Sequence, residues 1–219
     1  MTGSKGGSRQ NNADALAKMA SGGEASDPAA EDSGRVFQSI VLVTRGRPAL
    51  DVEKVKQRLA KWLGVSFPAG GDEMDNFIVG EDARYMVKLR STSMFMITLL
   101  PCPYFEGEDV SMYQLEDALR ERGGFIEGLC KLPGAIVIDA LLGPVADRLV
   151  LLAKLAAACI SADTKFMVCP ASFKAEKITE DLARQLVTAK SPGELLTPLC
   201  NFLPLAKDGK IFYRTFGMS

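Results

Sequence analysis

The nearly all-apolar stretch at 145–160 (VADRLVLLAKLAAACI) constrains the fold of this chain more than any other segment. It follows Pro144, which suits the first position of a helix. A helix that is apolar on every side has to be buried. Lys154 interrupts the stretch and Asp147 and Arg148 stand near its start, so it falls short of the about 20 apolar residues that cross a bilayer. We therefore expect a helix that packs inside a protein core.

Residues 1–34 differ in composition from the rest of the chain. They are rich in Gly, Ser, Ala, Asn and acidic residues, and they contain no aromatic or β-branched apolar side chain. Such a segment cannot bury enough apolar surface to offset the entropy lost on folding. We expect a disordered low-complexity tail at 1–34 and a single domain at 35–219, within the usual range of about 100 to 200 residues per domain.

Strand-like and helix-like segments follow one another through the first half of the domain. A first strand is expected from Val36 (VFQSIVLV), and an amphipathic helix at 51–63, with Asp51 as its N-cap and Gly64 as its stop. Three short strands should follow within 77–101. Charged and apolar residues alternate in the second of them, RYMVKLR, so one face should be solvated, whereas the third, MFMITLL, should be buried on both sides.

The second half of the domain continues this order. After a helix that begins near Ser111, we expect a central strand at 134–143, the apolar helix, and a strand at 165–170. Two short helices entered near Thr179 and Ser191 should lead to a last strand, IFYRTFGM. This order predicts an α+β domain with a mixed, mostly antiparallel sheet covered by helices and ferredoxin-like in part.

Histidine is absent from all 219 residues. Because histidine is the side chain that titrates near neutrality, its absence excludes catalytic triads, zincin sites and histidine proton relays. Lys and Arg together (26) nearly balance Asp and Glu (27), which leaves no overall field to attract nucleic acid or an anionic membrane. We expect neither of these as a partner.

The cysteines indicate a reducing compartment, since they are odd in number and widely spaced: Cys102, Cys130, Cys159, Cys169 and Cys200. No CxxC pair occurs, so we predict buried free thiols and no metal site. The N-terminal segment lacks the basic and apolar regions of a secretory signal. A cytoplasmic protein without a cofactor is expected.

The most distinctive local sequence is LLPCPYFEGED at 99–109, where an apolar strand runs into two prolines that flank Cys102. In a functional interpretation, Cys102 is a nucleophile presented at a strand end without help from histidine. In a structural interpretation, the prolines form a rigid exit from the strand and the thiol is buried.

Carboxylates give a second set of candidates. Glu106 and the acidic residues at 108 and 109 could act with Asp139 as paired carboxylates or as ligands of Mg²⁺ or Ca²⁺. Acidic residues before a helix are also favoured by its dipole, which needs no ligand. Asp139 follows the apolar run AIVI and is expected at or near a strand end, as a functional carboxylate or as the cap of a turn toward Gly143.

A weak candidate for anion binding is TRGRP at 44–48, where a strand gives way to a helix. Arg45 and Arg47 could hold an anion near the start of that helix, although exposed arginines are also common in short turns. Neither the Walker pattern nor GxGxxG is present.

The order of segments from 49 to 218 resembles an uncharacterised bacterial family of about two hundred residues, a domain of unknown function. The resemblance is carried by the helix ALDVEKVKQRLAKWL, by the strand end LLPCPYF, which is similar to a Met-Pro-x-Pro-type strand end, by LLAKLAAACISADTKFMVCP and by the terminal RTFGM. Members of that family often have histidines where this chain has GAIVIDALLG. The resemblance implies a fold and no activity.

We expect a non-catalytic protein that works through binding or interaction with a protein partner, because no catalytic constellation is found and the tail and balanced charge suit such a role. Two alternatives stay open. One is an enzyme that uses carboxylates or an unassisted cysteine. The other is a regulatory module with an apolar ligand pocket and a few polar anchors.

Overall fold

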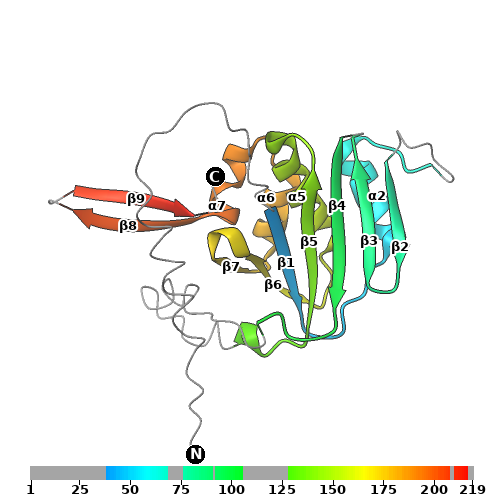
Figure 1. Cartoon of the computed structure of the whole chain (residues 1–219), viewed down its shortest axis with the longest axis horizontal. Helices are drawn as coiled ribbons and strands as arrows, with labels where there is room; N and C mark the ends of the chain where they lie inside the picture. The colour runs from blue at the N-terminus through cyan, green and yellow to red at the C-terminus, as the bar shows by residue number, and fades with distance from the viewer. Residues whose placement is uncertain (1–37, 69–75, 91, 106–127, 208–209, 217–219) are drawn as a thin grey trace, which may run out of the picture. The chain divides into compact units, whose positions relative to one another are not determined.

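Helix α5 (Val145–Cys159) is the apolar helix expected from the sequence, and it packs against a seven-stranded sheet (Figure 1). The computed structural model describes residues 38–68, 76–90, 92–105, 128–207 and 210–216, which all belong to one compact unit, Val36–Ser219. The tail expected at 1–34 and the helix expected near Ser111 lie outside the described residues.

The strands of the main sheet are β1 (Gln38–Thr44), β2 (Phe77–Glu81), β3 (Arg84–Leu89), β4 (Ser93–Leu100), β5 (Gly134–Leu142), β6 (Thr164–Cys169) and β7 (Lys174–Lys177). Their spatial order is β2-β3-β4-β5-β1-β6-β7, and every neighbouring pair is antiparallel. The expected α+β class with a mostly antiparallel sheet is confirmed.

Part of the sheet has the expected ferredoxin-like order. Strands β5 and β6 lie on either side of β1 and are connected through α5, which makes a split β-α-β unit. Strands β1 and β4 likewise lie on either side of β5, and the chain between them contains helix α2 (Val52–Leu63) and the hairpin β2-β3. The hairpin extends one edge of the sheet, and β7 extends the other.

Local signals define the helices that cover the sheet. The Oδ1 of Asp51 accepts a hydrogen bond from the Lys54 backbone N–H at 3.0 Å, and Gly64 ends α2 in the left-handed conformation with φ of 65°. Helix α6 (Glu180–Thr188) is capped by Thr179, whose Oγ1 accepts from Leu182 N–H at 3.1 Å. Figure 1 shows α2, α5 and α6 on the same side of the sheet.

A side-chain hydrogen bond also fixes α2 against α5. The Nη1 of Arg58 donates to the carbonyl oxygens of Ala158 at 2.7 Å and Ile160 at 2.8 Å. These carbonyls lie at the C-terminal end of α5, where the last turn of a helix lacks intrahelical donors. The guanidinium of Arg58, on α2, therefore supplies donors to the free carbonyls at the end of α5 and fixes the two helices against each other.

The remaining elements are short. They are the 3-10 turns η1 (Pro170–Ser172) and η2 (Pro192–Leu195), helix α7 (Leu196–Leu199), and a two-stranded sheet of β8 (Asn201–Lys207) and β9 (Lys210–Phe216). The last strand expected from the sequence corresponds to β9. Strands β7 and β8 were not expected, since KAEK has little apolar character and NFLPLAK contains a proline.

The main core lies between the sheet and its helices. Its largest fully buried side chains include Ile40, Leu42, Leu59, Phe95, Ile97 and Leu155. A smaller cluster on the opposite face, here called the second face, includes Val41, Val43, Ala135, Phe166 and Val168.

Strand β4 corrects one expectation. It was expected to be buried on both sides, but its residues alternate between buried and half-buried, with Phe95 and Ile97 on the helix side. The prediction was wrong because α2, α5 and α6 cover only one face of the sheet. In β3 the expected alternation is confirmed, since Val87 and Leu89 are buried while Arg84 is exposed.

Replacing a buried leucine of α5 tests this packing. Leu155 is fully buried, so Leu155→Ala should lower the free energy of unfolding by about 2–5 kcal/mol. Leu142→Ala is the matched control, because Leu142 is 51% exposed and should change stability by no more than about 0.5 kcal/mol. Urea unfolding measures both, and equal losses would contradict the described burial.

Candidate functional site

The arginines of the turn after β1 lie on the surface. Arg45 forms an ion pair with Asp163 at 3.1 Å, and the two side chains are 68% and 59% exposed. Arg47 is also exposed. An exposed pair of this kind contributes little, about 0–1 kcal/mol. Asp163 therefore partly neutralises the charge of Arg45, which the sequence suggested as a residue that holds an anion.

Asp139 corrects a second expectation. It lies in the interior of β5 and not near its end, because the strand continues to Leu142. Its neighbours across the sheet are Ser39 of β1 and Met96 of β4. The Ser39 hydroxyl donates to Asp139 Oδ1 at 2.5 Å, so the carboxylate holds a partner strand and does not cap a turn toward Gly143.

Cys102 does not join Asp139 in one site. Leu100, the last residue of β4, pairs with Ala135, which is four residues along β5 from Asp139, or about 13 Å. Cys102 lies beyond that end and is exposed, so the buried thiol expected there is wrong, although Cys159, Cys169 and Cys200 are buried as expected. Glu106 lies outside the described residues.

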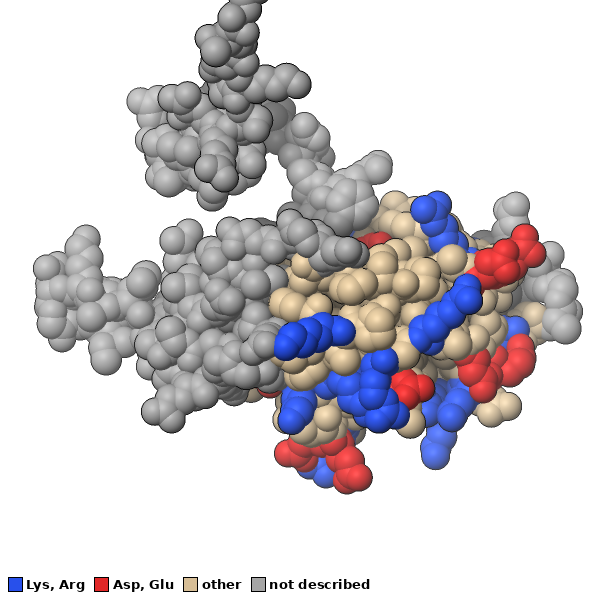
Figure 2. Space-filling model, turned by 90° about the horizontal axis from the view of Figure 1, so that it is seen from below, with Lys and Arg blue, Asp and Glu red and all other residues tan. Residues whose placement is uncertain are grey.

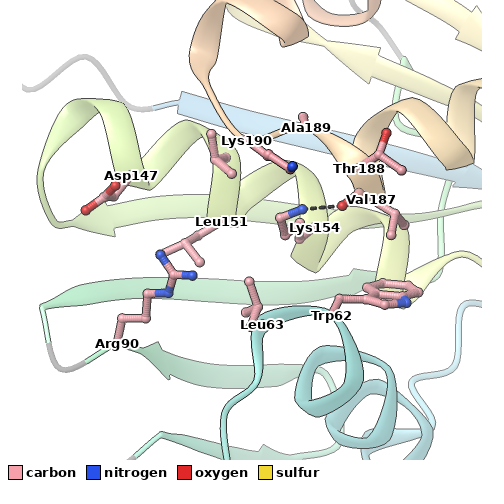
Figure 3. A pocket seen from close by; sticks show the side chains of 11 residues that line it. Trp62, Leu63, Arg90, Asp147, Leu151, Lys154, Val187, Thr188, Ala189 and Lys190 are labelled. Carbon is pink, nitrogen blue, oxygen red and sulfur yellow. Dashed lines mark hydrogen bonds between the residues drawn. The ribbon is translucent and has the colours of Figure 1, made fainter.

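The structure places a different cluster around a cavity of about 570 Å³ between α2, α5 and α6. We call it the lysine pocket. Its lining comprises Trp62, Leu63, Arg90, Asp147, Val150, Leu151, Lys154, Val187, Thr188, Ala189 and Lys190 (Figure 3). Its volume is within the range of small-molecule sites, about 300–1,000 Å³.

Lys154 forms the floor of this pocket. Its side chain leaves α5 among apolar residues and is only 8% exposed. Its Nζ donates to the carbonyl oxygen of Val187, in the last turn of α6, where helical carbonyls lack partners (Figure 3). That carbonyl is the one partner that the described residues give the ammonium group, and no carboxylate among them lies within ion-pair distance.

Arg90 enters the pocket from the turn between β3 and β4. Its φ of 53° is left-handed, which is rare for a residue other than glycine and strains the backbone by about 1–2 kcal/mol. The Arg90 N–H donates to Asn76 Oδ1 at 2.7 Å, and its carbonyl accepts from Thr92 N–H at 2.7 Å. The turn is therefore held in a conformation that places a cation beside α5.

Lys190 completes the set from the segment after α6. In Figure 3 the nitrogen end of Lys154 is directed at the Val187 carbonyl, the side chain of Arg90 extends toward Leu151, and the carboxylate of Asp147 points away from the other labelled side chains. Arg90 and Lys190 are exposed at the rim. The pocket thus presents two cations at its rim and one at its floor.

The environment lowers the pKa of Lys154. The main cause is burial, which disfavours the charged form, and the charges of Arg90 and Lys190 act in the same direction, while Glu194 acts against them. Glu194 is itself engaged with the backbone N–H of Lys190 at 3.3 Å and with Ser191 Oγ at 3.2 Å. A lysine in this setting is a strong candidate for function.

The sequence held only a faint signal for this site. Lys154 was recognised as an interruption of an apolar stretch, and Arg90 was assigned to a solvated strand face. Strand β3 ends at Leu89, however, and the left-handed turn directs Arg90 toward α5 instead. A charged residue that interrupts a buried helix is the one feature that could have pointed to a pocket.

Other site types find limited support. The described residues contain no group of three or more Cys, Asp or Glu side chains placed to hold a metal ion. On the face shown in Figure 2, a broad area of the described residues carries no charge, Lys and Arg lie mostly in its middle and lower part, and Asp and Glu lie mostly at its right and lower edges. Within the described ranges, no helix has both the length and the apolar character needed to cross a membrane.

Comparison of the chain with protein-family models, with curated proteins and with solved structures gives no match in any of the three. The site therefore has to be interpreted from its own chemistry.

Thiol alkylation tests the described burial. Burial raises the pKa of the Cys159 and Cys169 thiols to about 12, so neither forms the reactive thiolate at neutral pH. We expect the exposed Cys102 to react first with a maleimide, and Cys159 and Cys169 only after denaturant is added, as read by mass spectrometry. Labelling of Cys159 as fast as Cys102 in the folded protein would contradict the packing of α5.

The lowered pKa of Lys154 makes stability depend on pH. Between the lowered pKa in the folded state and about 10.4 in the unfolded state, the unfolded chain binds more protons, so the free energy of unfolding should rise as pH rises. Lys154→Met should remove this part of the rise. The exposed Lys177→Met should keep it, and urea unfolding across the alkaline range measures all three proteins. Identical pH profiles would contradict the described environment of Lys154.

Proposed function

We propose that this domain is a ligand-binding module that holds a small organic anion, a carboxylate with an apolar part, in the lysine pocket. The observation that supports the proposal most is Lys154, a buried lysine at the floor of an open pocket without a carboxylate partner among the described residues. A buried ammonium is costly unless an opposite charge meets it. An anionic ligand would supply that charge.

The rim supports the same ligand class. Arg90 and Lys190 add two exposed donors beside the buried one, and charge-assisted hydrogen bonds to a carboxylate are among the strongest in proteins. The strained backbone at Arg90 also fits a binding role, since such strain concentrates at functional sites. Trp62 and Leu63 of α2, which we call the apolar wall, and Val150 of α5 add apolar surface to the lining and favour an organic anion over inorganic phosphate.

We propose that binding takes place in the cytoplasm. All five cysteines are free thiols in the structure, which suits a reducing compartment.

Trp62 gives a direct test, because it is the single tryptophan of the chain and lines the pocket. Its fluorescence should change saturably on titration with 3-phenylpropionate or pyruvate, and much less with inorganic phosphate. A lack of response to any of these anions would contradict the proposed function. An equal response to phosphate would show that the apolar wall contributes nothing.

Two glycine substitutions separate binding from stability. Arg90→Gly and Asp82→Gly both relieve a left-handed backbone, at φ of 53° and 54°, so each protein should be as stable as the parent or more stable by up to about 1 kcal/mol. Only Arg90→Gly removes a cation from the pocket, and it should weaken anion affinity about tenfold or more. An unchanged anion affinity of Arg90→Gly would show that Arg90 does not contribute to binding.

Protein interaction, the role expected from the sequence, is the second candidate. It is favoured by the second face of the sheet, where Met86, Met94 and Met96 are half-buried and Val79 of β2 is 55% exposed. Methionine side chains adapt to varied partner surfaces.

Met96→Glu should then release a co-purifying protein and leave the Trp62 response unchanged. Retention of that protein would argue against this face.

A further inference from the structure

We propose that Lys154 captures its ligand covalently, as a Schiff base between its Nζ and the carbonyl carbon of a 2-oxo acid. This inference rests on the proposed function and names the ligand class of the same pocket. It goes further in one respect, because it makes the binding a reversible chemical step instead of an ion pair alone.

The layout of the cations supports a 2-oxo acid. Arg90 and Lys190 stand exposed at the rim, and Lys154 lies below them at the floor. A 2-oxo acid has its carboxylate and its carbonyl on adjacent carbons. A carboxylate held by a rim cation would place its adjacent carbonyl carbon inside the cavity that Lys154 also lines.

The state of Lys154 favours nucleophilic attack. An amine attacks only through its free electron pair, and burial together with the charges of Arg90 and Lys190 lowers the pKa of Lys154 and so increases its neutral fraction. The Val187 carbonyl accepts one N–H of Lys154 and orients Nζ. Unlike a carboxylate, this acceptor carries no negative charge. Glu194, the acidic group that opposes this shift, is occupied by the Lys190 backbone and by Ser191.

A second buried lysine shows what distinguishes Lys154. Lys174 is also 8% exposed, but its Nζ forms an ion pair with Glu176 at 2.8 Å. The ion pair holds the Nζ of Lys174 against Glu176, so this nitrogen is not presented to a ligand. Burial is thus the same in the two lysines, and the difference lies in the counter-charge.

The reaction is balanced without an oxidant or reductant. The electron pair of the neutral amine attacks the carbonyl carbon to give a carbinolamine. The former carbonyl oxygen then leaves as water, together with the two hydrogens of the amine, and a carbon–nitrogen double bond remains. A neutral imine carries no charge into the buried floor, which removes the cost of burying an ammonium.

Reductive trapping tests the proposal. The full-length protein is incubated at neutral pH with pyruvate and sodium cyanoborohydride, which delivers hydride to the imine carbon and makes the adduct permanent. Peptide mass spectrometry should find the adduct at Lys154, formed about tenfold or more faster than at the exposed Lys177. The buried Lys174 should stay unmodified.

Lactate is the matched ligand, because it has the carboxylate but a hydroxyl in place of the carbonyl. It should change Trp62 fluorescence and give no adduct. Lys154→Met should abolish trapping with pyruvate, whereas Lys177→Met should leave it unchanged. The circular dichroism spectrum of Lys154→Met serves to show that the variant folds.

The outcomes separate the two proposals. A saturable Trp62 response to pyruvate and lactate without an adduct at Lys154 would overturn the covalent step and leave reversible anion binding in place. Adducts spread evenly over surface lysines would overturn it as well. An absence of both response and adduct would overturn the proposed function together with this inference.

Discussion

Helix α5 carries apolar side chains around nearly its whole circumference, so it needs cover from the sheet below it and from helices on its flanks. Strands β5 and β1 supply the surface below, and α2 and α6 close the two sides. The ferredoxin-like order places β1 between the two strands that α5 connects, β5 and β6, so that β1 and β5 both lie under the helix. Burial of one helix thus explains why α2, α5 and α6 gather on the same face of the sheet.

Much of the fold could be predicted because its signals are local. Asp51 and Gly64 mark the two ends of α2, and Thr179 marks the start of α6, each through a cap that involves residues three or four positions away. The errors concern properties that depend on distant parts of the chain. The half-exposed side of β4 depends on which face the helices cover, and the interior position of Asp139 depends on how far β5 continues past it.

The lysine pocket could not be predicted for the same reason. Its three cations come from a turn after β3, from the middle of α5 and from the segment after α6, and nothing in the spacing of residues 90, 154 and 190 connects them. The direction of Arg90 depends on a side chain fourteen positions earlier, Asn76, which binds its backbone. Only Lys154 carried a signal in the sequence, as a charge within an otherwise apolar helix.

The hydrogen bonds of Arg58 have a mechanical consequence. Arg58 and Trp62 are four residues apart on α2 and therefore share one face of that helix. By gripping the Ala158 and Ile160 carbonyls, Arg58 fixes the rotation of α2 about its own axis, and with it the tryptophan wall one turn further on. The position of Trp62 is therefore set by two hydrogen bonds made by a residue that does not itself line the pocket.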